Sequence, residues 1–233
     1  MRRSNNMRIA LVAALSTLCC LADSSNVAVS TFSHDTKLTA DPASPEWKDA
    51  PAIRADNDPL GPAVPHHSTE IRSRWTHDNL YFLFICHFDQ LYLKPHPVIQ
   101  AETNHLWEWD VAEAFIGSDM ANIYRYKEFE ISPRGEWVDL DIDLKHPLPE
   151  GGWLWNSGFA SKTRIDEANK IWYGEMRIPF KSIASEAPAA GQRFRVNFYR
   201  MQGPPPGRKM IAWQPTHQKN YHVPEAFGLL ELK

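Results

Sequence analysis

The stretch YRYKEFEISPRGEWVDLDID, residues 124–143, decides the fold class. Two arms with alternating apolar residues flank a Pro-Arg-Gly turn at 133–135, which is the pattern of a β-hairpin. In the second arm Val138, Leu140 and Ile142 point one way and the aspartates between them point the other, because successive strand side chains alternate between faces. A period of two predicts strands here and not a helix.

The same signals recur on both sides of this hairpin. A hairpin is predicted over residues 70–88 with Asp78 and Asn79 in its turn, and another over residues 159–180 around the turn DEANK. No long segment has a helical period. The short strands and their Gly and Pro turns predict an all-β protein, an antiparallel β-sandwich of two sheets with a jelly-roll-like arrangement. Further strands are predicted over residues 111–117, 194–200 and 227–233, and a short helix over 181–187.

The alternation also predicts which strand residues form the core. The residues expected to point inward from the later strands are Trp172, Met176, Ile178, Phe194, Val196 and Phe198, with Glu175 and Arg177 on the opposite face.

The first residues have the features of a secretory signal peptide. Arginines precede the apolar run IALVAALSTLCCL at residues 9–21, which is short for a membrane span. Small residues before Asp23 predict cleavage after Ala22. We therefore expect a signal peptide over 1–22, a flexible lead-in over 23–43 and one domain over 44–233, secreted to the extracellular space or the periplasm. Lipoprotein anchoring through Cys19 is the lesser alternative, because Leu18 stands where a small residue is needed.

Composition narrows the classes of partner. The formal net charge is -3 and no long basic run follows the first residues, which argues against nucleic acid and anionic membranes as partners. After cleavage only Cys86 remains, so no internal disulfide can form. Its apolar strand-like surroundings predict a buried, inert thiol. Nine tryptophans are many for 233 residues and suggest a flat ligand.

Support for catalysis is weak. Asp139, Asp141 and Asp143 line one strand face at a spacing of about 6.5–7 Å, but the glutamates of a single-strand glycosidase pattern are missing. We predict a solvated strand face. There is no His-Glu-x-x-His, no Gly-x-Ser-x-Gly, no phosphate loop and no dinucleotide fingerprint. No catalytic residue and no metal ligand is therefore predicted, although a structural calcium ion stays open.

Sugar binding has better support in the residues. A pyranose has an apolar C–H face and a rim of hydroxyls, which aromatic rings and carboxylates can satisfy together. Trp107 and Glu113 are six residues apart and would share a face of an extended strand. The alternative reading places Trp107 in the core and Glu113 on the surface; for Trp109 the core is favoured. Long Pro- and Gly-rich loops, where binding residues often lie, carry Trp153, Trp155, Trp213 and Tyr221.

An ordered set of blocks resembles carbohydrate-binding module family 9 and its stand-alone relatives. The match runs from about Trp47 to the C-terminus. The resemblance implies a two-sheet β-sandwich that holds the terminal sugar of a chain between two tryptophans, in a family often attached to xylanases, so that ends of xylan or cellulose are the expected ligands. The blocks are NLYFLFICHFD, LWEWDVAEAFI, YKEFEISPRGEWVDLD, MRIPF, FRVNFYR and AWQPTHQKNYHVPEAFGLLEL.

The resemblance also implies site residues. The pattern Trp-x-x-Asp-x-x-Glu is met by Trp107, Asp110 and Glu113, which makes Trp107 one stacking wall and Glu113 a hydroxyl acceptor. Arg125 on the following strand would contact hydroxyls. Tyr221 would be the second wall, a departure from the tryptophan of the family pattern that reduces the stacking area. Further candidates are Trp213, as a fallback for the second wall, and Asn220, as a rim contact.

These observations predict a monomeric, non-catalytic protein that binds oligosaccharide or polysaccharide ends in carbohydrate catabolism, without a cofactor. One alternative is a glycoside hydrolase using Glu113 with Asp139 or Asp141. Another is a relative of the same fold that has lost its ligand and serves in protein contacts. A third is a haem-binding electron-transfer relative, without covalent attachment because no Cys-x-x-Cys-His occurs, whose axial ligand would come from the histidines or from Met120, Met176, Met201 and Met210.

Overall fold

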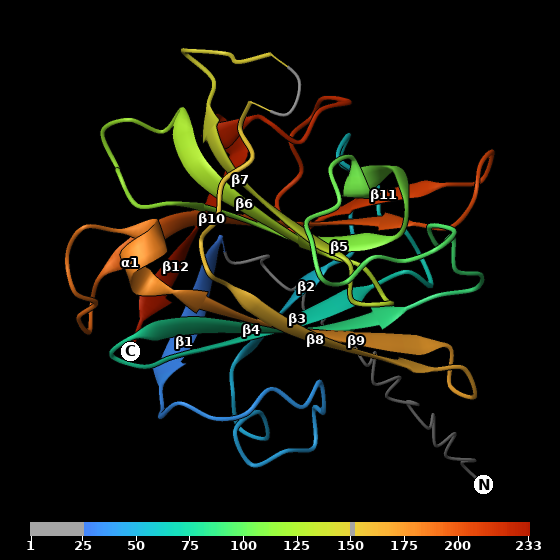
Figure 1. The fold of residues 1–233 in the computed structure, drawn as a ribbon, viewed down its shortest axis with the longest axis horizontal. Helices are drawn as coiled ribbons and strands as arrows, with labels where there is room; N and C mark the ends of the chain where they lie inside the picture. The colour runs from blue at the N-terminus through green and yellow to red at the C-terminus, as the bar shows by residue number, and fades with distance from the viewer. Residues whose placement is uncertain (1–25, 150–151) are drawn as a thin grey trace, which may run out of the picture.

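The computed structural model describes residues 26–149 and 152–233, so the predicted signal peptide lies outside the described residues. The described part is built mainly from strands (Figure 1), which confirms the all-β class. Its elements in chain order are β1 (Val27–Phe32), β2 (Ala52–Ala55), β3 (Thr69–Trp75), β4 (Asn79–His87), η1 (Leu106–Glu108), β5 (Val111–Gly117), β6 (Arg125–Ile131), β7 (Trp137–Asp143), β8 (Ala160–Asp166), β9 (Ile171–Pro179), α1 (Phe180–Ile183), β10 (Arg193–Gln202), β11 (Lys209–Ala212), η2 (Pro224–Ala226) and β12 (Gly228–Leu232).

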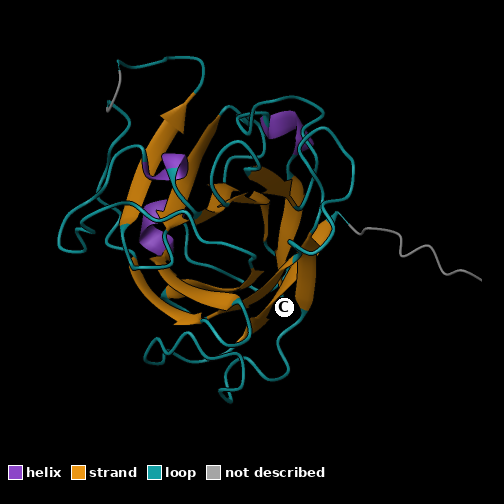
Figure 2. Cartoon of the chain, turned by 90° about the vertical axis from the view of Figure 1, so that its right-hand side faces the viewer, coloured by secondary structure: helices purple, strands orange, loops and turns teal. Residues whose placement is uncertain are grey.

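The strands form two layers that are joined along one edge. One layer has the order β7-β6-β5-β10-β12 with β11 beside β10, and the other has the order β8-β9-β4-β3 with β2 beside β3. Strand β1 joins them, because Val27 to Ser30 pair with β12 while Thr31 and Phe32 pair with β3. The expected two-sheet sandwich is thus one continuous, nearly closed sheet, seen end-on in Figure 2.

Strand β1 corrects two expectations. Residues 27–32 were expected to belong to a flexible lead-in, but they form a strand with Ala28 and Ser30 buried. The strand also runs parallel to both neighbours, so the sheet is not antiparallel throughout. The physical reason is that β12 and β3 would otherwise present unpaired backbone groups at an exposed edge.

The main core fills the space between the two layers. All six residues predicted to point inward from the later strands, Trp172 to Phe198, belong to it. Phe198 of β10 meets Phe82 of β4 edge to face with ring centroids 5.0 Å apart, so the layers interlock. Cys86 is buried in the same core, and burial raises the pKa of its thiol to about 11, which confirms the predicted buried thiol.

The aspartate face of β7 is not solvated, contrary to expectation. Asp139 is fully buried, and its carboxylate accepts the Ser157 N–H at 2.7 Å. Asp141 is half-buried and lies 2.6 Å from the Lys127 ammonium. The loop around residues 153–157 runs along β7 and covers this face, because the Trp155 N–H bonds the Asp139 carbonyl.

A second apolar cluster lies on the outer face of β5, β6, β7 and β10. Strand side chains alternate, so Val138, Leu140 and Ile142 point to this face while the neighbouring core residues point inward. The loop after β7 and the segment before β12 lie together above β6 and β7 (Figure 1). Loops therefore partly cover an apolar sheet face, and a hollow remains between them and the sheet.

Candidate functional site

A pocket of about 320 Å³ opens on the outer face of β5, β6, β7 and β10. This volume is within the usual range for small-molecule sites, about 300–1,000 Å³. Two tryptophans, one tyrosine and two carboxyl groups meet in it: Trp107, Trp153, Tyr221, Glu113 and Glu128. The remaining apolar lining is contributed by Phe115, Leu140, Ile142, Met201 and Met210.

Contacts with His105 and Arg208 hold Trp107 at the pocket. It lies half-buried in η1, and the His105 ring packs against it with centroids 4.8 Å apart. The Arg208 guanidinium donates to the Trp107 carbonyl at 2.9 Å and to the Trp109 carbonyl at 2.6 Å. Trp107 and Glu113 do line one pocket, although residues 106–108 form a 3-10 turn and not the extended strand on which the same-face argument rested.

Asp110 has an anchoring role between Trp107 and Glu113. Its carboxylate is fully buried and accepts the N–H groups of Tyr92 at 3.0 Å and Gly203 at 2.6 Å. It therefore ties the loop after β4 and the turn after β10 to the start of β5. The middle residue of the Trp-x-x-Asp-x-x-Glu pattern supports the pocket and does not line it.

Three glutamates form a buried carboxyl cluster at this face. Glu113, Glu128 and Glu130 are exposed by only 2%, 3% and 0%. Glu113 and Glu130 are direct partners in the β5–β6 register. One oxygen of Glu113, one of Glu128 and both of Glu130 accept no hydrogen bond from an N–H or hydroxyl group of the described residues. The Glu128 and Glu130 carboxyls instead bond each other, with a proton on Glu130 that it donates to Glu128. Buried oxygens with so few partners are rare and call for an explanation.

The charge state of the cluster follows from its burial. Burial is the main cause that raises the pKa of all three carboxyls, well above the ordinary value for Glu113 and Glu130. Repulsion from Glu128 adds to the shift of Glu113, and Glu113 and Glu128 add to that of Glu130. The cluster therefore holds protons that ordinary surface glutamates release.

Tyr221 lines the pocket, but little of its ring is accessible to a ligand. Its ring stacks on Tyr199 with centroids 4.0 Å apart and an interplanar angle of 12°. Its hydroxyl accepts the Ile211 N–H at 3.1 Å and donates to the Arg200 carbonyl at 3.2 Å. Only 7% of the residue is exposed, so one ring face is already used for packing. Tyr221 offers a ligand little stacking area.

Trp153 is a pocket residue that the sequence did not single out for the site. It is half-buried, and its indole N–H has no acceptor among the described residues. Its carbonyl accepts the Asp141 N–H at 2.9 Å, which ties the loop to β7. The available signal was an aromatic-rich loop with Pro and Gly, but a sequence does not reveal over which face such a loop folds.

Two of the predicted site residues, Arg125 and Trp213, lie outside the pocket, whereas Asn220 lies in its lining. Arg125 is exposed on β6, points to the opposite side from Glu128, and contacts Asp141 at 3.3 Å. Trp213 is 4% exposed and packs in the main core against Phe198, with centroids 5.8 Å apart. Asn220 is exposed in the pocket lining. Neither Arg125 nor Trp213 therefore lines this pocket, whereas Asn220 does.

The carboxylate pair of a hydrolase does not assemble. Asp139 and Asp141 alternate with Leu140 on β7, and Leu140 is on the pocket face with Glu113. Both aspartates therefore point to the other side of the sheet. Neither aspartate is among the residues that line the pocket of Glu113.

Few groups here could hold a metal. Within residues 26–149 and 152–233, no group of three or more His, Cys, Asp or Glu side chains is arranged to hold a metal ion. The structural calcium ion stays an untested prediction.

Of the methionines considered as haem ligands, Met201 and Met210 line the pocket, Met176 is in the core and Met120 is exposed elsewhere. No helix of the described part is long and apolar enough to cross a membrane.

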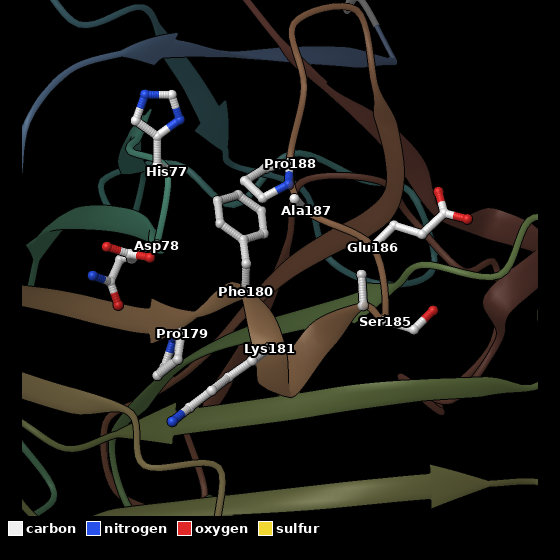
Figure 3. A pocket seen from close by; sticks show the side chains of 11 residues that line it. His77, Asp78, Pro179, Phe180, Lys181, Ser185, Glu186, Ala187 and Pro188 are labelled. Atoms are coloured by element: carbon white, nitrogen blue, oxygen red, sulfur yellow. The ribbon is translucent and has the colours of Figure 1, made fainter.

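A larger hollow of about 530 Å³ lies beside α1. Figure 3 shows Phe180 and Lys181 of this segment near His77 and Asp78 of the β3–β4 turn. Phe180 is 3% exposed and no tryptophan or tyrosine faces it across the hollow. This hollow lacks the paired flat surfaces and unpartnered carboxyls of the pocket on the outer face, which remains the candidate site.

Comparisons with known proteins agree with the fold. The family model for carbohydrate family 9 binding domain-like proteins matches residues 41–233. A carbohydrate binding module family 9 from Caldicellulosiruptor kristjanssonii superposes with a TM-score of 0.66 in complex with cellotriose, at 13% identity over 89% of this chain and 93% of that one. The structure of a module of this family from the same organism in complex with glucose superposes with a TM-score of 0.64, at 14% identity over 89% of this chain and 95% of that one.

A curated relative matches over a smaller part of the chain. An "Extracellular protein" of Arthroderma benhamiae is 24% identical over 147 residues, which is 55% of this chain and 63% of the relative. The chain therefore spans less than two thirds of the length of that relative.

Proposed function

The chain belongs to the carbohydrate family 9 binding domain-like family, and from this premise we propose that it is a non-catalytic protein that holds the terminal sugar of a plant-type oligosaccharide or polysaccharide. One observation carries the proposal. Two half-buried tryptophans, Trp107 and Trp153, line the same pocket as an unpartnered oxygen of Glu113. Flat apolar rings beside buried polar groups are what a pyranose needs on its faces and rim.

Each group has a specific role in the proposed complex. The rings of Trp107 and Trp153 contact the C–H faces of the sugar, and Tyr221 adds a smaller apolar surface. Glu113 accepts hydrogen bonds from hydroxyls, and the indole N–H of Trp153 donates to a hydroxyl oxygen. Asn220 contributes at the rim. One sugar with a few hydrogen bonds would bind with a Kd between about 1 μM and about 1 mM, roughly -8 to -4 kcal/mol.

The arrangement favours binding over hydrolysis. A glycosidase needs two carboxyl groups on opposite sides of the bond it cleaves, and the glutamates of this pocket come from the neighbouring strands β5 and β6 on one sheet face. We propose that the protein supports carbohydrate catabolism by holding chain ends of xylan or cellulose type. The signal-like N-terminus and the relative called an extracellular protein support secretion, and we expect a monomer.

Titration of the purified protein with glucose, xylose, cellobiose and xylobiose, followed by tryptophan fluorescence, tests the proposal. Trp107→Ala should abolish a saturable signal while the folded content stays unchanged. Trp109→Ala is the matched control, because Trp109 stacks on Tyr92 at 4.6 Å and does not line the pocket. Equal loss in both variants, or no saturable signal for any sugar, would remove the basis for the proposal.

Non-covalent haem binding is a second candidate function for the same pocket. Met201 and Met210 are partners in the β10–β11 register, so their sulfurs lie on one wall, and His222 lines the pocket as well. One methionine with His222 could supply two axial ligands, and haem would then supply electron transfer. An absorption spectrum after incubation with haem distinguishes the two functions, since a Soret band that is lost in both Met201→Ala and His222→Ala would favour haem.

A further inference from the structure

We propose that the sugar held in this pocket carries a positively charged amino group, which makes the ligand class an unacetylated hexosamine end; this rests on the proposed function. The carboxyl cluster is the reason. Two of its members, Glu113 and Glu128, line the pocket and are at least 97% buried, and one buried oxygen of each accepts no N–H or hydroxyl hydrogen bond. In the empty pocket burial keeps protons on these carboxyls, and an ammonium group bound between Glu113 and Glu128 would take the place of those protons, which leave to solvent.

The strand register explains why the three carboxyls cannot all lose their protons in the empty pocket. Glu113 faces Glu130 directly across β5 and β6, and Glu128 is two residues from Glu130 on the same face of β6. Like charges opposite one another in a sheet destabilise it. Burial in an apolar face strengthens this repulsion, because the local dielectric is low. A bound cation would relieve the repulsion.

The protein's own cations do not neutralise the cluster. Arg208 is engaged with the carbonyl groups of Gly203, Trp107 and Trp109 and sits 3.9 Å from Asp110. Arg200 points to the inner face, where it bonds the His87 carbonyl at 2.6 Å.

The remaining basic groups lie at the margins of the cluster. His222 lines the pocket, and its Nδ1 is 2.6 Å from the Tyr126 hydroxyl. Lys219 is exposed at the rim, with no ion pair to a described residue. Lys127 is on the other side of β6 with Asp141. The charges of Arg208 and His222 lower the pKa of Glu113 and Glu128, but burial raises it by more, so these cations do not draw the protons off the cluster.

The shape of the pocket favours an organic cation over a metal ion. The carboxyl groups do not converge as metal ligands within the described part of the chain. The surroundings are tryptophans and methionines, which contact a ring and also attract an ammonium group through their polarisable or π surfaces. A single ammonium has three donors, which is enough to reach one oxygen of Glu113 and one of Glu128 at the same time. A charged hydrogen bond of this kind is stronger than a hydroxyl contact.

The test compares three disaccharides of the same β-1,4 shape: the glucosamine dimer, its fully N-acetylated form and cellobiose. Calorimetric titrations at about pH 6, below the ordinary range of an α-amino group, should show the amine bound on the order of tenfold tighter than cellobiose. The preference should weaken with added salt. In Glu128→Gln the two affinities should become about equal, while the matched control Asp141→Asn, outside the pocket, should keep the preference.

The outcomes separate the two proposals. Cellobiose bound as tightly as the amine, or more tightly, would overturn the hexosamine inference and leave the proposed function intact. Binding of none of the three sugars would overturn both. A preference for the amine that persists in Glu128→Gln, or that calcium ions abolish by occupying the cluster, would also overturn the inference.

Discussion

Replacement of Glu130 by glutamine should stabilise the protein, and the gain should grow with pH. Glu130 is fully buried, faces Glu113 in the register and adjoins Glu128. Cross-strand Cβ atoms lie about 5 Å apart, and two unit charges at about 5 Å repel by about 3 kcal/mol at an effective dielectric constant of about 20. The folded protein avoids most of this repulsion by keeping a proton on Glu130. We therefore expect a gain of about 1–3 kcal/mol near neutral pH, because each pH unit over which only the unfolded chain releases this proton costs the wild type about 1.4 kcal/mol.

The pH window follows from the direction of the shift. Burial, then repulsion from Glu113 and Glu128, raises the pKa of Glu130 well above 4.5. Below pH 4.5 the group is neutral in both the folded and the unfolded chain. As the pH rises, the unfolded chain releases the proton and the folded chain holds it, so the free energy of unfolding falls until the pH passes the folded pKa. Glutamine does not titrate, so the difference between variant and wild type widens over this window.

Urea unfolding at several pH values from about 4.5 to about 9, followed by tryptophan fluorescence, measures this difference. Glu231→Gln is a control of opposite sign. Arg193 donates to Glu231 and lowers its pKa, so that this carboxylate contributes stability that is lost as the pH falls. A Glu130→Gln variant that is less stable than wild type, or whose gain does not change with pH, would refute the reasoning.

The remaining predictions concern the core and the edges of the site. Trp213→Ala should cost about 3–5 kcal/mol in thermal or urea unfolding, because it removes a buried ring from the main core; a loss below about 1 kcal/mol would place Trp213 outside the core. Tyr221→Phe should cost about 1–3 kcal/mol, because the Ile211 N–H loses its acceptor, and sugar affinity should change little; unchanged stability would contradict the assigned hydrogen bond. Cys86 should resist thiol reagents at about pH 8 in the folded protein and react in urea, because burial raises its pKa to about 11; rapid labelling without urea would contradict this.

The strands were predictable because their pattern is local. Alternation identified the hairpins and the inward-facing residues of β9 and β10, and turn residues marked where strands end. Strand β1 was missed because its pairing partners lie far away along the chain, and a six-residue segment in a polar region has little signal of its own. The buried state of Asp139 was missed for a different reason, since alternation shows which residues share a face but not that the loop after the strand folds back over that face.

The candidate site was predictable where it follows a compact pattern. Trp107, Glu113, Tyr221 and Asn220 meet in one pocket, whereas Trp153 enters only through the path of its loop. The carboxyl cluster was not predicted because each glutamate alone resembles a surface residue. Only the register of β5 with β6 shows that they share a buried face. Such residues lower stability and are retained at functional sites, which fits the use of this pocket for a ligand.

The indole N–H signals of the nine tryptophans in a two-dimensional NMR spectrum, recorded during titration with cellobiose, test the central claim most directly. We expect the signals of Trp107 and Trp153, assigned by substitution, to shift progressively and saturably. The signals of the core residues Trp172 and Trp213 should stay in place. Shifts confined to tryptophans outside the pocket, or no shift of any indole signal with any of the sugars, would contradict a sugar site on the outer face of β5, β6, β7 and β10.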